Sequence, residues 1–143
     1  ILWKAEVLIQ LDRQDEALPL INKIRQRAAN SLENLKTADG SYILNYKCEL
    51  YKPGVNCTWT KEFAWKAMEW ENRLELACEG RRFFDLQRWG TLEKTMNAYF
   101  AVERNRFDWM NIARFTAGRD EFFPISQAQM KWAKGNYTQN PGY

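Results

Sequence analysis

The sequence predicts an all-α fold, in which a helical hairpin is followed by an irregular helical C-terminal region. Apolar residues recur three and four positions apart through several stretches of the chain, which is the spacing of one buried helix face. Residues that favour helix ends border these stretches, with Thr60 and Ser126 as N-caps and Gly80 and Gly90 as stops. A chain of 143 residues that is 45% hydrophobic and 27% charged suits one domain with a buried core.

Residues 1–30 are predicted to form two short amphipathic helices joined by a tight turn. Asp15 suits the N-cap of the second helix. Pro19 falls in the first turn or so of that helix, where its missing N–H costs least. A single helix pair cannot bury its own apolar face, so the hairpin needs neighbours. The apolar positions are Leu2, Ala5, Leu8, Ile9 and Leu11 in the first helix, and Ala17, Leu18, Ile21, Ile24 and Ala28 in the second.

Residues 31–59 are predicted to be a long irregular connection. Asp39-Gly40 is a turn signal. Residues 41–44 and 46–51 are candidate short strands that would pair as a hairpin. A connection of this length in a compact domain is usually functional or flexible.

Residues 60–143 are predicted to form the helical C-terminal region. Thr60 caps its first helix, and Gly80 ends that helix as a left-handed residue, a conformation in which a Cβ is penalised. We therefore expect a positive φ at Gly80. The predicted buried stripe of this helix is Phe63, Ala67, Trp70, Leu74 and Cys78.

Three further helices are predicted after Gly80. A short helix over residues 81–89 is closed by Gly90, and another covers residues 91–103. Ser126 and Gln129 form a capping box that opens a last short helix before a polar tail.

Composition argues against several classes of function. The net charge of +3 is mild and the basic residues are interleaved with acids, so no nucleic-acid partner is expected. The chain has no histidine, which removes Ser-His and Cys-His nucleophile pairs and most zinc sites. No phosphate-binding loop, nucleophile elbow or metal-ligand spacing is present, so we expect no catalytic residues, no metal and no cofactor.

The apolar runs and the first residues of the chain indicate whether it carries a membrane span or a signal peptide. No apolar run is long enough to span a bilayer, and the first residues do not resemble a signal peptide. The chain opens in what reads as the middle of a helix. We therefore expect it to be a C-terminal fragment of a longer protein.

The three cysteines allow two interpretations. Cys48 and Cys57 lie nine positions apart in the long connection, and an oxidising compartment would permit a disulfide between them. In that case Cys78 stays free and buried on the same helix face as Leu74. The alternative is three free thiols.

A dense group of charges lies around the predicted helix junction. Arg82, Asp85 and Arg88 are three positions apart and share one helix face, with Glu79 just before them. Paired acids can serve glycoside hydrolysis. These residues are, however, spaced to satisfy one another, so we interpret Glu79, Gly80, Arg82, Asp85 and Arg88 as a structural motif.

Two sequence motifs resemble one known family. The first runs from Arg73 to Gly90 and reads RLELACEGRRFFDLQRWG. The second joins Phe123-Pro124-Ile125 to the closing run NYTQNPGY. Together, in this order, they resemble the signature of the SusD/RagB family of outer-membrane nutrient-binding lipoproteins. The resemblance covers most of residues 1–30 and 60–143.

This resemblance implies a fold and a location. Members of the family are all-α proteins in which tetratricopeptide-like helix pairs support an irregular ligand-binding face. By this resemblance, residues 1–143 are a single C-terminal domain fragment, whose residues 1–30 are the last tetratricopeptide-like hairpin. The full-length lipoprotein would lie at the cell surface, held in the outer membrane by an N-terminal lipid anchor that this sequence does not contain.

The resemblance also implies a function. Members bind oligosaccharides or peptides and act with a TonB-dependent transporter of the SusC type, without catalysis. We therefore expect a glycan-binding protein that delivers nutrient to such a transporter, and the alternative is a tetratricopeptide-like module that binds protein or peptide. Because loops commonly carry binding residues, Tyr46, Tyr51 and Trp59 are the candidate ligand-binding residues.

Overall fold

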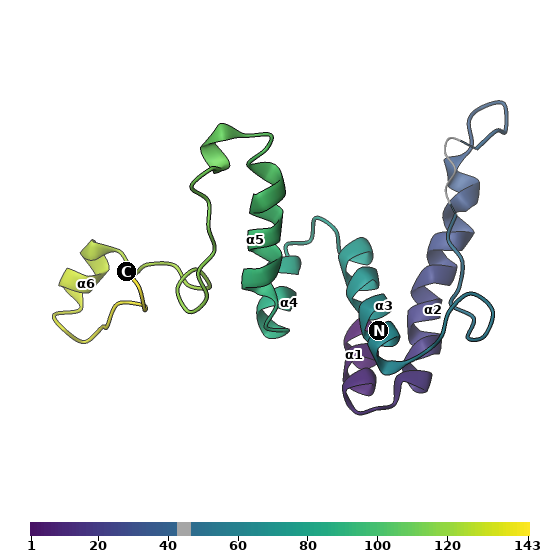
Figure 1. Ribbon diagram of the computed structural model, residues 1–143, viewed down its shortest axis with the longest axis horizontal. Helices are drawn as coiled ribbons and strands as arrows, with labels where there is room; N and C mark the ends of the chain where they lie inside the picture. Colours follow the sequence, from purple (N-terminus) through teal and green to yellow (C-terminus); the bar gives the residue numbers. More distant parts are fainter. Residues whose placement is uncertain (43–46) are drawn as a thin grey trace. The chain divides into compact units, whose positions relative to one another are not determined.

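The computed structural model describes residues 1–42 and 47–143, and this part of the chain is helical (Figure 1). It contains six α-helices and two 3₁₀ helices, and the described residues form no β-strand. The predicted all-α fold class is therefore confirmed. The chain divides into two compact units, Ile1–Gly80 and Arg81–Tyr143. The helices are α1 (Leu2–Gln10), α2 (Gln14–Asn30), η1 (Ser31–Leu35), α3 (Lys61–Glu75), α4 (Arg82–Arg88), α5 (Leu92–Glu103), η2 (Asp108–Met110) and α6 (Gln127–Trp132).

The first unit begins with the predicted hairpin of α1 and α2. Asp12 ends α1 in the left-handed conformation, with φ of 58°. Its N–H donates to the carbonyl oxygen of Ile9, and the N–H of Arg13 donates to that of Leu8 at 2.8 Å. This pair of bonds is a Schellman motif, which satisfies carbonyl groups at the helix end and reverses the chain. Asp15 lies in the first turn of α2 rather than at its N-cap, so that detail of the prediction is wrong.

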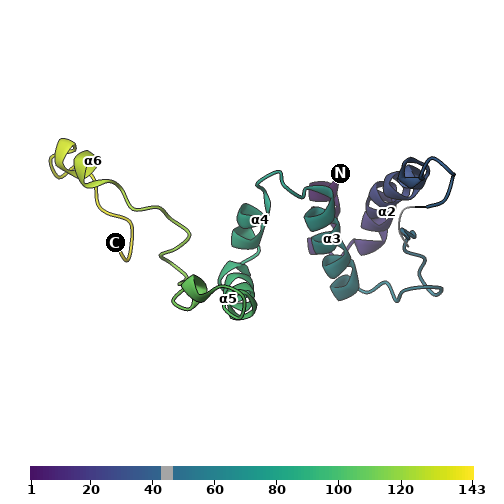
Figure 2. The ribbon, with the colours of Figure 1, turned by 90° about the horizontal axis from the view of Figure 1, so that it is seen from above.

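Helix α3 packs against both helices of the hairpin and runs parallel to α2 (Figures 1 and 2). Two ion pairs join α2 to α3 in the same order along both helices, Arg25 with Glu71 at 2.6 Å and Arg27 with Glu75 at 2.5 Å. Lys61, at the start of α3, pairs with Asp12 in the turn before α2. The two helices therefore start at the same end of the unit.

The start of α3 was predicted correctly. The hydroxyl oxygen of Thr60 accepts the N–H of Phe63 at 3.2 Å, which confirms the N-cap. The predicted buried face is confirmed at Ala67, which is 3% exposed, but it is wrong at Trp70 and Leu74, which are 46% and 63% exposed. A neighbouring face of the helix packs against the hairpin instead. The buried face consists of Ala64, Ala67, Met68, Glu71 and Asn72.

The end of α3 also differs from the prediction. Gly80 has φ of 72°, so its expected left-handed conformation is confirmed. The helix nevertheless ends at Glu75, and turns lead from there to Gly80. Cys78 lies in these turns with φ of 65°, a value that a right-handed helix cannot continue through. Its side chain is exposed, so the expectation of a buried Cys78 is wrong.

The connection between α2 and α3 contains isolated bridges in place of the predicted strands. Lys36 and Tyr42 form an antiparallel bridge across the Asp39-Gly40 turn. Half of the first candidate strand and the start of the second lie outside the described residues, and residues 47–51 pair with no strand among the described residues. The strand hairpin is therefore not formed in the described residues, because their backbone bonds go to side chains and turns.

The second unit has its core between α4, α5 and the segment after them. Leu86, Leu92 and Phe115 are buried together, and Trp89, Met96 and Phe100 pack against them. Gly90 has φ of 69° and ends α4 in a second Schellman motif, in which the N–H of Thr91 donates to the Leu86 carbonyl oxygen at 2.9 Å. The predicted stop at Gly90 is confirmed.

The closing part of the second unit is tied together by side-chain amides. Gln139 accepts the N–H of Ile125 and donates to its carbonyl oxygen, both at 2.8 Å, and Asn140 donates to the carbonyl oxygen of Phe123 at 2.6 Å. The two halves of the second sequence motif therefore contact each other directly. The hydroxyl oxygen of Ser126 accepts the N–H of Gln129, which confirms the predicted N-cap of α6. Within the described ranges, no helix combines the length and the apolar character needed to cross a membrane.

Candidate functional site

Residues 47–59 of the long connection, here called the return segment, run along α2 in the opposite direction. Its last residue, Trp59, donates its indole N–H to the carbonyl oxygen of Gln14 at 3.0 Å. In its middle, the backbone N–H and C=O of Tyr51 bond the side-chain amide of Asn22 at 2.8 and 2.9 Å. The segment is therefore attached to α2 at successive points.

Arg25 attaches the first residues of the return segment. Its Nε donates to the carbonyl oxygen of Glu49 at 2.5 Å, and its Nη1 donates to Glu71 on α3 at 2.6 Å. The guanidinium also lies 4.3 Å from the centre of the Tyr51 ring. Burial by itself would lower the pKa of Arg25, but the hydrogen bond and negative charge of Glu71 outweigh it, and the pKa is raised. Arg25 therefore stays charged and joins two helices to the return segment.

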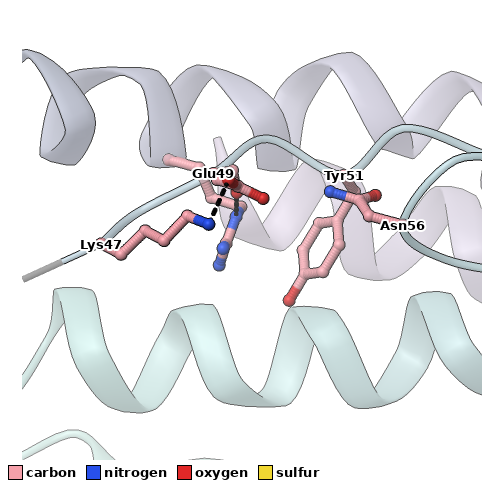
Figure 3. A pocket seen from close by; sticks show the side chains of 5 residues that line it. Lys47, Glu49, Tyr51 and Asn56 are labelled. Atoms are coloured by element: carbon pink, nitrogen blue, oxygen red, sulfur yellow. Dashed lines mark hydrogen bonds and ion pairs between the residues drawn. The ribbon is translucent and has the colours of Figure 1, made fainter.

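A tight turn follows within the return segment. The side-chain amide of Asn56 accepts the N–H of Lys52 at 2.7 Å and donates to the carbonyl oxygen of Leu50 at 2.9 Å. Gly54 supplies a φ of 76° at the tip, which residues with a Cβ rarely adopt. The turn places Asn56 beside Tyr51 (Figure 3).

Tyr51, Trp59 and Phe63 form an aromatic cluster between the return segment and α3. The ring centres lie 5.5 to 5.8 Å apart, with Phe63 meeting the other two rings edge to face. Such pairs stabilise a fold beyond the area that they bury. Burial raises the pKa of the Tyr51 hydroxyl above its ordinary value. The ring faces of the cluster are used mainly for internal packing.

A shallow depression of about 310 Å³ lies beside this cluster (Figure 3). Lys47 and Glu49 stand at its exposed side and pair with each other at 2.8 Å, while the Tyr51 ring points toward α3. The depression thus offers a guanidinium, an ammonium, a carboxylate, a phenol and an amide within one small surface. Its lining residues are Arg25, Lys47, Glu49, Tyr51 and Asn56.

The structure separates the three predicted ligand-binding residues. Tyr51 lines the depression, whereas Trp59 packs in the cluster and is not among the residues that line it. Tyr46 lies outside the described residues. Sequence reasoning missed the polar lining, because only the fold brings Arg25 of α2 next to residues 24 positions later. The one available signal was the charged and amide residues that surround Tyr51 in the sequence.

A second depression, of about 360 Å³, lies on α6. It is lined by Ala128, Gln129 and Trp132, and the Trp132 side chain is 75% exposed. No charged group lines it. Within the ranges 1–42 and 47–143, no group of three or more His, Cys, Asp or Glu side chains could hold a metal ion.

The charged motif at the start of the second unit centres on Asp85. Asp85 is 4% exposed, and its Oδ1 lies 3.0 Å from Arg88 and 3.6 Å from Arg81. The predicted pairing of Asp85 is thus confirmed. The guanidinium groups of Arg82 and Arg88 lie 5.8 and 5.7 Å from the Trp89 ring centre. A structural role for this motif, which includes the exposed Glu79 and the left-handed Gly80, remains a prediction.

The three cysteines are free thiols in the structure. The proposed Cys48–Cys57 disulfide is therefore not formed. The thiol of Cys48 instead points to α2, where its Sγ lies 3.4 Å from the carbonyl oxygen of Arg25. Cys57 is half-buried and bridges to Pro53 at the base of the turn. Side-chain amides and Arg25 order this loop in place of a covalent bridge.

Together these features define a class of α-helical protein, in which packed helices support a polar loop and the described residues form no sheet. Comparison with known sequences identifies the family within this class. The chain belongs to the SusD family, whose model matches residues 1–143. It is also similar to the SusD-like protein P38 of Formosa agariphila, with 32% identity over 109 residues. That match covers 76% of this chain and 19% of the relative, so the chain spans less than a fifth of the relative's length. The predicted family is confirmed.

Proposed function

We propose that the protein containing this chain binds oligosaccharides at the bacterial cell surface and passes them to a SusC-like TonB-dependent transporter. The observation that carries this proposal is the match of the SusD family model to the whole of residues 1–143. The proposal includes an outer-membrane lipoprotein anchored at its N-terminus and a function in binding rather than catalysis. It involves no cofactor and no nucleic acid.

Within this chain, we propose the depression beside Tyr51 as a ligand contact. Its lining side chains end in groups that donate or accept hydrogen bonds, which suits the hydroxyl groups of a sugar. The return segment is held by Asn22 and Arg25 before any ligand arrives. A preformed site avoids part of the entropy cost of ordering a loop on binding.

The arrangement of the return segment argues against the alternative of a peptide-binding tetratricopeptide-like module. Such modules hold peptide in the groove between helices. Here the protein's own segment lies along α2, and its Tyr51 packs on Phe63 of α3. A peptide would have to displace these bonds and the aromatic cluster.

Affinity electrophoresis of the full-length protein in polysaccharide gels tests the proposal. Retardation by at least one polysaccharide supports glycan binding, and retardation by none, together with binding to a peptide library, would support the alternative. Lys47→Ala and Tyr51→Phe should weaken retardation. Lys23→Ala is the matched control, because Lys23 is an exposed lysine of α2 that does not line the depression.

Delivery to a transporter needs a separate test. Affinity purification of the tagged full-length protein from outer membranes should recover a TonB-dependent transporter. Glycan binding without any recovered transporter would remove the delivery step from the proposal and leave the binding step.

A further inference from the structure

We propose that the depression beside Tyr51 selects oligosaccharides that carry a carboxylate, such as those containing uronic acids, and that Arg25 and Lys47 bind this carboxylate. This inference rests on the proposed function and narrows its substrate class. It is based on which hydrogen-bond donors of the charged lining residues are already bonded within the protein and which are left for a ligand.

The first observation concerns Arg25. Its Nε donates to the backbone carbonyl oxygen of Glu49, and its Nη1 donates to the carboxylate of Glu71. Its Nη2 has no hydrogen-bond partner within residues 1–42 and 47–143. Two fixed nitrogen atoms hold the guanidinium plane in place. Guanidinium groups bind carboxylates through charge-assisted hydrogen bonds, and a fixed orientation makes that binding selective.

The second observation concerns the charges of the lining. Arg25 and Lys47 are positive and Glu49 is the one negative residue among the five that line the depression. Glu71 is 4% exposed and accepts a hydrogen bond from Arg25, so it orients the guanidinium without lining the depression. The side chains of Lys47 and Glu49 are 78% and 55% exposed, so their mutual pair is weak. A ligand carboxylate can therefore compete with Glu49 for the ammonium group of Lys47.

The third observation concerns the aromatic rings. Neutral sugars gain much of their affinity from stacking on an exposed ring face. Here Arg25 lies over the Tyr51 ring, and Trp59 and Phe63 also pack against that ring. Little ring face remains for a sugar, so charged and polar contacts dominate at this site. This favours a ligand with a negative charge over a neutral one.

The test uses the full-length protein and pairs of polysaccharides that differ only in charge. Polygalacturonate, alginate and glucuronan are each compared with their carboxyl-reduced, neutral forms by affinity electrophoresis and titration calorimetry. We expect at least one acidic member to bind about tenfold more tightly than its reduced form. This preference should decrease as salt concentration rises.

Two substitutions with opposite expected signs make the test specific. Lys47→Gln should weaken binding of the acidic glycan, and Glu49→Gln should strengthen it, because it removes the competing carboxylate. Both side chains are exposed, so neither change should affect folding, and the bond of Arg25 to the Glu49 backbone is retained. Lys23→Gln, the matched control, should leave affinity unchanged.

Each outcome separates the inference from the proposed function. Equal binding of acidic and reduced glycans, or no effect of Glu49→Gln, would overturn the charge preference while glycan binding stands. If the protein binds neither these polysaccharides nor neutral ones, the proposed function itself fails. A preference for acidic glycans with opposite effects of the two substitutions supports the inference.

Discussion

Glu71→Gln should destabilise the first unit, because it breaks the buried ion pair between α2 and α3. Glu71 is 4% exposed and lies 2.6 Å from Arg25, whose side chain is 19% exposed. Removing one partner of a buried pair typically costs about 3–5 kcal/mol, because the other charge is left without compensation. Arg25 retains its bond to Glu49 and some contact with water. We therefore expect a smaller cost of about 2–3 kcal/mol, just below that range.

A second ion pair between the same two helices provides the control. Arg27 and Glu75 lie 2.5 Å apart, but the Arg27 side chain is 68% exposed. Exposed pairs contribute less than about 1 kcal/mol, so Arg27→Ala should have a small effect. Urea unfolding followed by far-UV circular dichroism measures both variants. The reasoning fails if Glu71→Gln costs no more than Arg27→Ala.

The position of Arg25 gives a second readout for the same variant. Without Glu71, the guanidinium loses one of the two contacts that fix its plane over Tyr51. Heteronuclear NMR should then show chemical-shift changes that spread from α3 into the return segment. In Arg27→Ala the return segment should keep its shifts. If the chemical-shift changes in Glu71→Gln are confined to α3, then the bond between Glu71 and Arg25 does not help to hold the return segment in place.

Four smaller predictions concern single residues in both units. Gly80→Ala should cost about 1–2 kcal/mol in urea unfolding, because φ is +72° and an added Cβ meets no atom within 4 Å, which leaves only the backbone cost. Asp85→Asn should cost about 1–2 kcal/mol, since the carboxylate is buried but its arginine partners reach solvent; unchanged stability with lost glycan binding would make Asp85 functional. Asn97→Asp should lower the melting temperature in calorimetry, because a carboxylate cannot donate to the carbonyl oxygen of Phe115 as the amide does at 2.9 Å. NMR titration should give Asp39 a pKa of about 2, below the ordinary 3.8, because hydroxyl and amide groups of its own turn donate hydrogen bonds to its carboxylate. The stabilisation that these bonds provide should be complete above pH 3.8 and should be lost as the pH falls toward 2.

Local features were predictable from the sequence because their causes lie within a few residues. The N-caps at Thr60 and Ser126 each need one hydroxyl and an N–H three positions later. The left-handed Gly80 and Gly90 follow from the strain that a Cβ would cause. The family was recognisable for a related reason, since its motifs are contiguous runs.

Features that depend on distant partners were not predictable in the same way. Two helical stripes overlap in α3, one through Phe63 and Trp70 and one through Ala64 and Met68, and only packing against the hairpin selects the second. The depression requires Arg25 to meet Glu71, 46 positions later.

Extended segments in this chain obtain their backbone bonds from side-chain amides, which sequence reasoning also missed. Asn22, Asn97 and Gln139 each accept an N–H and donate to the carbonyl oxygen of one residue: Tyr51, Phe115 and Ile125 respectively. A strand partner would supply the same two bonds. Segments that read as candidate strands can therefore be satisfied without any sheet.

The parallel course of α2 and α3 limits how the length of this chain can change. A helix of 17 residues is about 26 Å long, and an extended chain covers about 3.3–3.6 Å per residue, so the path back needs at least about eight residues. The return segment exceeds this minimum by only a few residues, so longer deletions within it would make that path too short. The Asp39-Gly40 turn lies before the return begins and is closed by its own hydrogen bonds. A label or an inserted peptide at this turn should therefore leave the helices in place.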